Sequence, residues 1–258
     1  MKIGCLTLAF NQGLYLQTAI NSVISQNKVS EYYIYNPGST DNTSEVLDKN
    51  RSMVTEIYVE SDLGPSDGLN AGLEKIQSDI FYYLNADDRV VSGAFSYVTT
   101  YFSENPYCDV LHGSINVIDR NDQVIRTLPA MNFTLRGYAL GYSVVYQQAT
   151  FFRRQAIPKA AFNVDNRISW DGELIVDLAM GGAKIHQTQT ILGEFRIYSE
   201  SITGSGRYVD LAKKEHARIA RKILGRNPRA FEKIFAFLIR KFRAIKRRIN
   251  PQIEYIES

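Results

Sequence analysis

The first hundred residues alternate short apolar runs with segments of helical periodicity, and this alternation constrains the fold more than any other feature. Apolar runs at residues 2–8, 32–35, 56–59 and 80–84 are predicted strands. Between them, apolar residues recur every three or four positions, as at Leu16, Ala19, Ile20 and Val23, which predicts helices. A strand–helix order of this kind predicts a mostly parallel sheet with helices on both faces.

A polar loop follows each of the four predicted strands. The loops read "AFNQ", "NPGSTDN", "SDLGPSDG" and "NADD". In an open parallel sheet, ligands bind in the crevice beyond the carboxyl ends of the strands. We therefore expect the four loops to converge on one site.

The alternation weakens beyond residue 105. The sequence predicts two strands joined by a turn at 120–122 and a further strand in "YQQATFFRR". It also predicts a helix over 170–180 and an extended segment from 191. Helices follow from about 209, with an interruption at 225–228. A chain of 258 residues suits one large domain with an appendage. We predict a domain over 1–205, with halves 1–105 and 106–205, and a helical tail over 206–258.

Cysteine usage and hydropathy bear on the compartment. Cys5 and Cys108 both lie in apolar runs, which favours buried, reduced thiols and a reducing compartment. The N-terminal apolar run is too short for a signal peptide. The sequence contains no run of 18 apolar residues, so no transmembrane span is predicted. We expect a cytoplasmic protein.

Charge is concentrated near the C-terminus. Residues 213–248 hold 14 Lys/Arg and 2 Asp/Glu. An apolar helical stripe runs through the same segment, at Phe231, Ile234, Phe235, Leu238, Ile239, Phe242 and Ile245. A basic amphipathic helix predicts binding to a membrane surface. Packing of the stripe on the body or on a second subunit is the alternative. Nucleic acid is not an expected partner, because no aromatic stacking platform or known motif accompanies the charge.

The predicted strand over 80–84 ends in Asn85, Asp87 and Asp88. Taken alone, this pattern is typical of a polar turn. It also suits Mg²⁺ or Mn²⁺, which take oxygen ligands and need only one or two carboxylates when substrate phosphates supply the rest. Asn85 and Asp87 are two residues apart and share a face on an extended segment.

Five segments in order resemble the family 2 glycosyltransferases of the GT-A fold. They read "NPGSTDNT", "SDLGPSDGLNAG", "YYLNADD", "YQQATFFRR" and "WDGELIVDLAMGGAK", and the resemblance covers about residues 1–205. It implies a metal-dependent, inverting transfer from a nucleotide-diphosphate sugar to a hydroxyl of a saccharide or lipid-linked acceptor, as in bacterial surface polysaccharide synthesis. The implied cofactor is Mn²⁺ or Mg²⁺. The implied location is cytoplasmic or peripheral at the inner face of the cell membrane.

The resemblance also implies residue roles. Asp87 would bind the metal, and Asp171 would be the catalytic base, with Glu173 as the nearest competitor. The predicted contacts to the nucleotide-sugar are Thr7, Phe10, Asn11, Asn36, Asp67, Asn85, Ala86 and Asp88. Gln148, Glu173 and Arg196 are predicted to contact the acceptor or a phosphate.

Two positions depart from the family pattern. Asn36 stands where the family has an Asp that hydrogen-bonds the base, and Asn offers a donor as well as an acceptor. Tyr198 stands where His is common, so a phosphate contact there would fall to Arg196. Asn36 as a simple turn former is an alternative. At the level of function, the alternatives are a non-catalytic nucleotide-sugar-binding protein and a sugar nucleotidyltransferase. A nucleotidyltransferase would carry a Gly-rich, Arg-containing signature after the first strand, and the segment "TLAFNQGLY" at that place lacks it. A homo-oligomer remains open.

Overall fold

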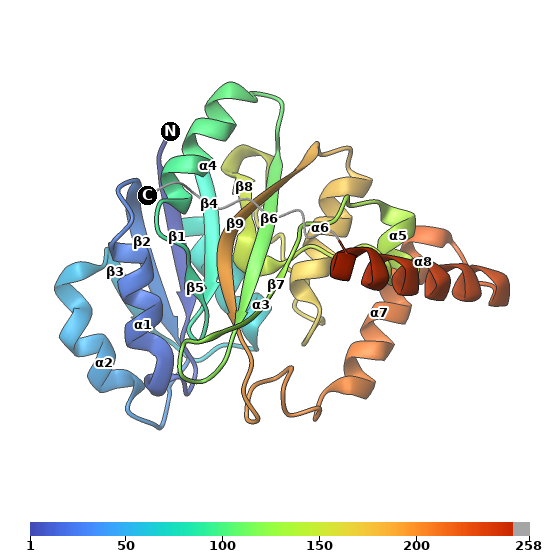
Figure 1. Ribbon diagram of the computed structural model, residues 1–258. Helices are drawn as coiled ribbons and strands as arrows, with labels where there is room; N and C mark the ends of the chain where they lie inside the picture. The colour runs from blue at the N-terminus through green and yellow to red at the C-terminus, as the bar shows by residue number, and fades with distance from the viewer. Residues whose placement is uncertain (250–258) are drawn as a thin grey trace.

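The computed structural model describes the backbone of residues 1–249 and the side chains of residues 1–243. All nine strands that it describes belong to one sheet, in the order β3-β2-β1-β4-β8-β6-β9-β5, with β7 beside β6 (Figure 1). Helices cover both faces of this sheet (Figure 1). The predicted α/β layering is confirmed.

The N-terminal half is the parallel part of the sheet. Its strands are β1 (Ile3–Leu8), β2 (Val29–Asn36), β3 (Glu56–Val59) and β4 (Ile80–Asn85). The helices that alternate with them are α1 (Gly13–Ile24), α2 (Thr43–Asn50), α3 (Pro65–Lys75) and α4 (Ala94–Glu104). The polar loops predicted to converge therefore leave one edge of the sheet.

The C-terminal half makes the sheet mixed. β8 (Thr150–Arg153) runs antiparallel to β4 and β6 (Val110–Ile118), and β9 (Ile185–Arg196) runs parallel to β6. β7 (Val124–Leu128) forms the predicted hairpin with β6. β5 (Arg89–Val90) pairs with β9. Two residues are too few to give a periodicity, so β5 was not predicted.

Alternation along β4 divides the core between the two faces of the sheet. Tyr82 lies on the face covered by α4, where its ring meets Phe95 edge-on with centroids 5.5 Å apart. Tyr83 lies on the opposite face and meets Phe162 edge-on, also at 5.5 Å. That face is covered by α3 and α6 (Trp170–Met180). β4 ends beside the end of β1, where Asn85 is paired with Leu8, whereas β8 pairs with the beginning of β4.

Three more α-helices besides α6 lie in the second half of the described chain. α5 (Leu135–Ala139) and α6 pack against α7 (Val209–Leu224), and α7 ends at Gly225, whose φ of 66° suits a left-handed cap. α8 (Ala230–Ile249) extends along the right of the view in Figure 1. The predicted tail thus begins with a helix that is bound to the body, and its residues 250–258 lie outside the described residues. None of the helices in the described part combines the length and the apolar character needed to cross a membrane.

Candidate active site

Asp88 anchors the loop that follows β4. Its side chain is 1% exposed. Oδ1 accepts a hydrogen bond from the backbone N–H of Arg196 at 2.9 Å, and Oδ2 accepts from Gln148 at 2.8 Å and from Asn85 at 3.3 Å. Burial, and then the charge of Asp87, raise the pKa of Asp88. Both of its oxygens are used within the protein, so Asp88 positions the loop, and its predicted contact with the sugar stays a prediction.

Asp87 is the more accessible carboxylate of the pair. Its Oδ2 accepts a hydrogen bond from the hydroxyl of Tyr198 at 3.1 Å. The same hydroxyl lies 3.2 Å from Oε1 of Gln12, in the loop after β1. Burial raises the pKa of Asp87, while the Tyr198 hydrogen bond and the charge of Arg196 oppose that rise. Tyr198 and Gln12 were not among the predicted site residues, and only the departure from His at 198 singled out that position.

Arg196 supports this loop from inside the protein. Its side chain is fully buried, with the guanidinium 4.4 Å from the ring centroid of Tyr15. Nε donates to the carbonyl of Asp87 at 2.8 Å, and Nη1 lies 2.6 Å from the carboxylate of Asp122. Arg196 therefore fixes the backbone that carries Asp87, and its predicted phosphate contact stays a prediction.

The donor set at Asp87 fits a cation that is held partly by substrate. Among the described residues there is no group of three or more His, Cys, Asp or Glu side chains that could hold a metal ion. Asp87 alone would supply a carboxylate. Mg²⁺ and similar cations are commonly bound by one or two carboxylates together with substrate phosphates. The single carboxylate of Asp87 is compatible with a cation that takes its other ligands from a bound substrate.

Most of the predicted nucleotide residues lie around the ends of β1, β2 and β4, and Asp67 lies in α3, which follows β3. Asn11 joins two loops, because its Oδ1 accepts from the backbone N–H of Thr40 at 2.8 Å. Asn36 is buried at the end of β2, and Phe10 is 56% exposed in the loop after β1. Thr7 is buried and its hydroxyl is hydrogen-bonded to Tyr32, and Ala86 is also buried. Asp67, in the first turn of α3, accepts a hydrogen bond from the backbone N–H of Leu63.

Asp171 lies in the first turn of α6, as predicted, and its surroundings suit a base. Burial raises its pKa, opposed by the backbone N–H of Gly172. A side chain at Gly172 would meet the hydroxyl of Tyr138 at 1.9 Å, so Tyr138 lies against this turn. Burial raises the pKa of Tyr83, and the charge of nearby Asp171 raises it further. Trp170 and Leu174, which flank Asp171 on α6, belong to the same core cluster as Tyr83, so this turn of α6 packs on the face of β4, the strand that leads to Asp87.

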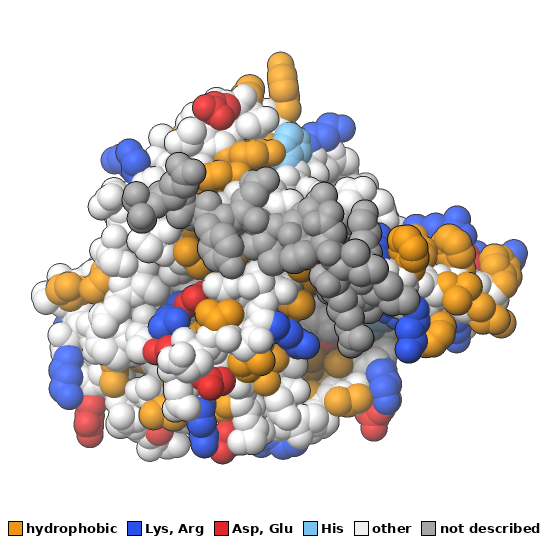
Figure 2. Space-filling view, in the orientation of Figure 1, with side chains coloured by type: hydrophobic (Ala, Val, Ile, Leu, Met, Phe, Trp, Pro, Cys, Tyr) orange, Lys and Arg blue, Asp and Glu red, His pale blue; other side chains and the backbone are white. Residues whose placement is uncertain are grey.

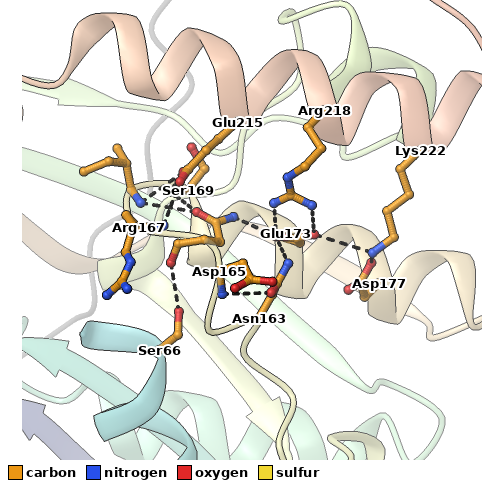
Figure 3. Close-up of polar contacts among 12 residues, drawn as sticks. Ser66, Asn163, Asp165, Arg167, Ser169, Glu173, Asp177, Glu215, Arg218 and Lys222 are labelled. Carbon is orange, nitrogen blue, oxygen red and sulfur yellow. Dashed lines mark hydrogen bonds and ion pairs between the residues drawn. The ribbon is translucent and has the colours of Figure 1, made fainter. Parts of the chain in front are cut away.

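Helix α7 holds the start of α6 in place (Figure 3). Glu215 accepts backbone hydrogen bonds from Arg167, Ile168 and Ser169, at 2.7, 3.0 and 2.9 Å. One of its neighbours on α7, Lys222, forms an ion pair with Asp177 at 2.5 Å. These residues belong to the segment that the charge pattern assigned to a separate tail, so their role in positioning Asp171 was missed.

Glu173 belongs to the same network. It is 2% exposed and accepts two hydrogen bonds from Arg218, at 2.6 and 2.5 Å, and one from Asn166 at 2.7 Å. Despite its burial, the hydrogen bonds and charge of Arg218 lower the pKa of Glu173 to about 2. A carboxylate held this way is a weak proton acceptor, which favours Asp171 as the base. The predicted acceptor contact of Glu173 stays a prediction.

The chain resembles known glycosyltransferases in sequence. It is 27% identical over 213 residues to an uncharacterized glycosyltransferase of Nostoc sp. (strain PCC 7120), covering 77% of this chain and 65% of that protein. It is 23% identical to the poly-β-1,6-N-acetyl-D-glucosamine synthase of Staphylococcus epidermidis, covering 71% of this chain and 45% of the synthase. The chain thus spans just under two thirds of the first relative and under half of the second.

Solved structures share the fold. The structure of S. aureus TarS 1–349 in complex with UDP-GlcNAc matches with a TM-score of 0.67 at 16% identity, covering 93% of this chain and 70% of TarS. The mannosyltransferase PcManGT of Pyrobaculum calidifontis, in complex with GDP-Man and Mn²⁺, matches with a TM-score of 0.65 at 11% identity, covering 98% and 76%. These matches establish the GT-A fold. The sequence model of glycosyl transferase family 2 matches residues 5–159, and the chain belongs to that family.

Proposed function

We propose that this protein is a metal-dependent, inverting glycosyltransferase that transfers a sugar from a nucleotide-diphosphate sugar to a hydroxyl of a saccharide or lipid-linked acceptor. One observation carries the proposal. Asp171 lies in the turn of α6 whose Trp170 and Leu174 pack in the same core cluster as Tyr83 on β4, and β4 leads directly to Asn85 and Asp87. A candidate base and a candidate metal ligand therefore border the same end of the sheet.

The residues would divide the reaction between them. Asp87 would hold Mn²⁺ or Mg²⁺ against the diphosphate, and the cation would stabilise the negative charge on the leaving group. Asn85 and Ala86 would border the ribose, while Asp88 keeps the loop in place through Gln148. Asp171 would take the proton of the acceptor hydroxyl as its oxygen attacks the anomeric carbon from the face opposite the diphosphate. One relative named as a glycosyltransferase and another named as a poly-β-1,6-N-acetyl-D-glucosamine synthase support this reaction class.

A donor screen tests the proposal. The purified protein is mixed with a panel of nucleotide-sugars with and without Mn²⁺, and both the melting temperature and sugar release are measured. We expect at least one nucleotide-sugar to stabilise the protein, more strongly with Mn²⁺, and to be slowly hydrolysed. Asp87→Ala should lose the metal-dependent part of the stabilisation by nucleotide-sugar. Asp48→Ala, at an exposed position on α2, should retain it.

The alternative functions are separated when the screen is repeated with a panel of acceptors and, in a parallel assay, with nucleoside triphosphates and sugar phosphates. Stabilisation without turnover on any acceptor would indicate a non-catalytic binding protein. Release of diphosphate from a nucleoside triphosphate and a sugar phosphate would indicate a nucleotidyltransferase. If no nucleotide changes the melting temperature with or without metal, the proposed function is wrong.

We also propose that α8 binds an anionic membrane surface, which would keep the enzyme at the inner face of the membrane. The apolar stripe faces away from the body: Phe231, Ile234, Phe235, Leu238 and Phe242 are 56–69% exposed, whereas Ala236 and Glu232 on the other side are 0% and 2% exposed. Figure 2 shows these hydrophobic side chains on α8 interspersed with Lys and Arg. Apolar area combined with cations suits anionic lipid. The described stripe is not packed on the body.

Binding to vesicles tests this second proposal. The protein should sediment with vesicles that contain phosphatidylglycerol and not with pure phosphatidylcholine. The double variant Phe235→Ser/Leu238→Ser should lose binding. The matched control Val124→Ser/Ile125→Ser, which also removes two exposed apolar side chains, should retain it. If the wild type instead forms a dimer that the first double variant breaks, with no vesicle binding, the stripe belongs to a subunit interface.

A further inference from the structure

The amide of Asn36 has one end satisfied and one end free. The side chain is 1% exposed, and its Oδ1 accepts hydrogen bonds from the backbone N–H groups of Gly38 at 3.2 Å and Ser39 at 2.8 Å. Within the described residues, its Nδ2 is buried without a hydrogen-bond partner. Backbone N–H groups only donate, so the atom that faces them must be the oxygen. The orientation of the amide is therefore determined, and an N–H₂ donor is left over.

A leftover donor of this kind calls for an explanation, because buried polar groups in native proteins almost always have partners. An unpaired donor is costly in the free protein, and an acceptor atom of a ligand would remove that cost. Asn36 is the last residue of β2, at the carboxyl edge of the sheet. Ligands of open parallel sheets bind at this edge.

The position of Asn36 relative to Asp87 suits the base of a nucleotide. β1 lies between β2 and β4, and neighbouring strands are about 4.8 Å apart, so the ends of β2 and β4 are roughly 10 Å apart. A nucleotide with its diphosphate at Asp87, after β4, can extend its base toward the end of β2. The loop that follows is open at Gly38, where an added Cβ would have no atom within 4 Å.

We propose that Nδ2 of Asn36 donates a hydrogen bond to the base of the nucleotide-sugar, an inference that rests on the proposed function. This donor selects a base whose pairing edge carries an unprotonated ring nitrogen. Cytosine N3 and adenine N1 are such acceptors. Uracil N3 and guanine N1 carry a hydrogen and would face the amide donor to donor. A carboxylate at position 36 would invert this selection, because both of its oxygens accept.

Nucleotide binding to the wild type and to Asn36→Asp tests the inference. Isothermal titration calorimetry with Mn²⁺ gives Kd for CDP, ADP, UDP and GDP. The wild type should bind CDP or ADP about tenfold or more tightly than both UDP and GDP, since one hydrogen bond replaces a donor–donor contact. Asn36→Asp keeps the oxygen that accepts from Gly38 and Ser39, and should shift the preference about tenfold or more toward UDP and GDP.

Two further variants complete the test. Asn36→Ser removes Nδ2 without adding a charge and should bind all four nucleotides within a few-fold of one another. Asn42→Asp, the same substitution at an exposed position of the same loop, should retain the wild-type order. A wild-type preference for UDP or GDP, or an order that Asn36→Asp leaves unchanged, would overturn the inference and leave the proposed function standing. If the wild type binds no nucleotide, the proposed function itself fails, and the inference fails with it.

Discussion

The hydroxyl of Tyr198 donates a hydrogen bond to Oδ2 of Asp87 across 3.1 Å, although the two residues are 111 positions apart in the chain. Tyr198 follows the end of β9, and Asp87 follows β4. The contact joins the segment after β9 to the loop after β4 at the candidate metal ligand. Arg196, two residues before Tyr198, bonds the carbonyl of the same Asp87. Two segments that are distant in the sequence therefore determine the direction of this carboxylate.

Tyr198→Phe should weaken metal binding without preventing nucleotide binding. Loss of a group that orients a metal ligand commonly costs about 10–100-fold in metal affinity. We expect at least a tenfold higher Mn²⁺ concentration for half-maximal nucleotide binding, measured by titrating Mn²⁺ at fixed nucleotide. Tyr208→Phe, at an exposed position before α7, is the control. An unchanged Mn²⁺ dependence in Tyr198→Phe would mean that the hydroxyl does not position the ligand.

Asp171→Asn should abolish sugar transfer while leaving nucleotide binding intact. A general base contributes about 10²–10⁴-fold to rate, and Asn cannot accept the proton. Transfer rate and nucleotide Kd are measured on the same preparation. Asp165→Asn, at an exposed position six residues earlier, should behave as the wild type. Transfer by Asp171→Asn at the wild-type rate would exclude Asp171 as the base.

Asp171→Asn should also stabilise the protein at neutral pH. Burial raises the pKa of Asp171 above its ordinary value of 3.8, so the folded state binds the proton more tightly than the unfolded state. Stability of the wild type therefore falls as pH rises from about 3.8 to the raised pKa, by about 1.4 kcal/mol per unit of difference. Urea unfolding at pH 7 should show the variant to be more stable. Below pH 3.8 the two proteins should converge, and a difference that is independent of pH would contradict this account.

Glu173→Gln should destabilise the protein by about 1.5–3 kcal/mol at pH 7, because the ionised carboxylate accepts charge-assisted hydrogen bonds from Arg218. The pKa of Glu173 is lowered from 4.5 to about 2, so this stabilisation is complete above pH 4.5 and disappears as pH falls to about 2. Thermal unfolding across pH 2–7 measures the difference. Glu74→Gln, at an exposed position on α3, should cost much less. An equal loss in both variants would show that the Arg218 contact contributes little.

Much of the fold is local information. Strand and helix periodicity identified the four parallel strands and the helix over 170–180, because alternation and the 3.6-residue repeat record which side of an element is buried. The loop sequences placed Asn36, Asp87 and Asp171 at the ends of elements, where the structure has them. β5 was not predicted, because its two residues form a strand only through pairing with β9.

Contacts between segments that are distant in the chain could not be predicted from the sequence. The pattern "NADD" does not say that Asp88 is enclosed by Gln148 and Arg196 while Asp87 remains partly accessible. The charges of α7 were counted as part of the predicted basic helical tail, and only packing against α6 revealed Glu215 as the acceptor for the turn before Asp171. The stripe of α8 has the same periodicity whether it faces the body or solvent, so its exposure was decided by tertiary structure. The sequence by itself determined which residues border the sheet edge. Tertiary structure decided which of their polar atoms are already paired and which remain free, because hydrogen-bond partners come from residues that only folding brings together.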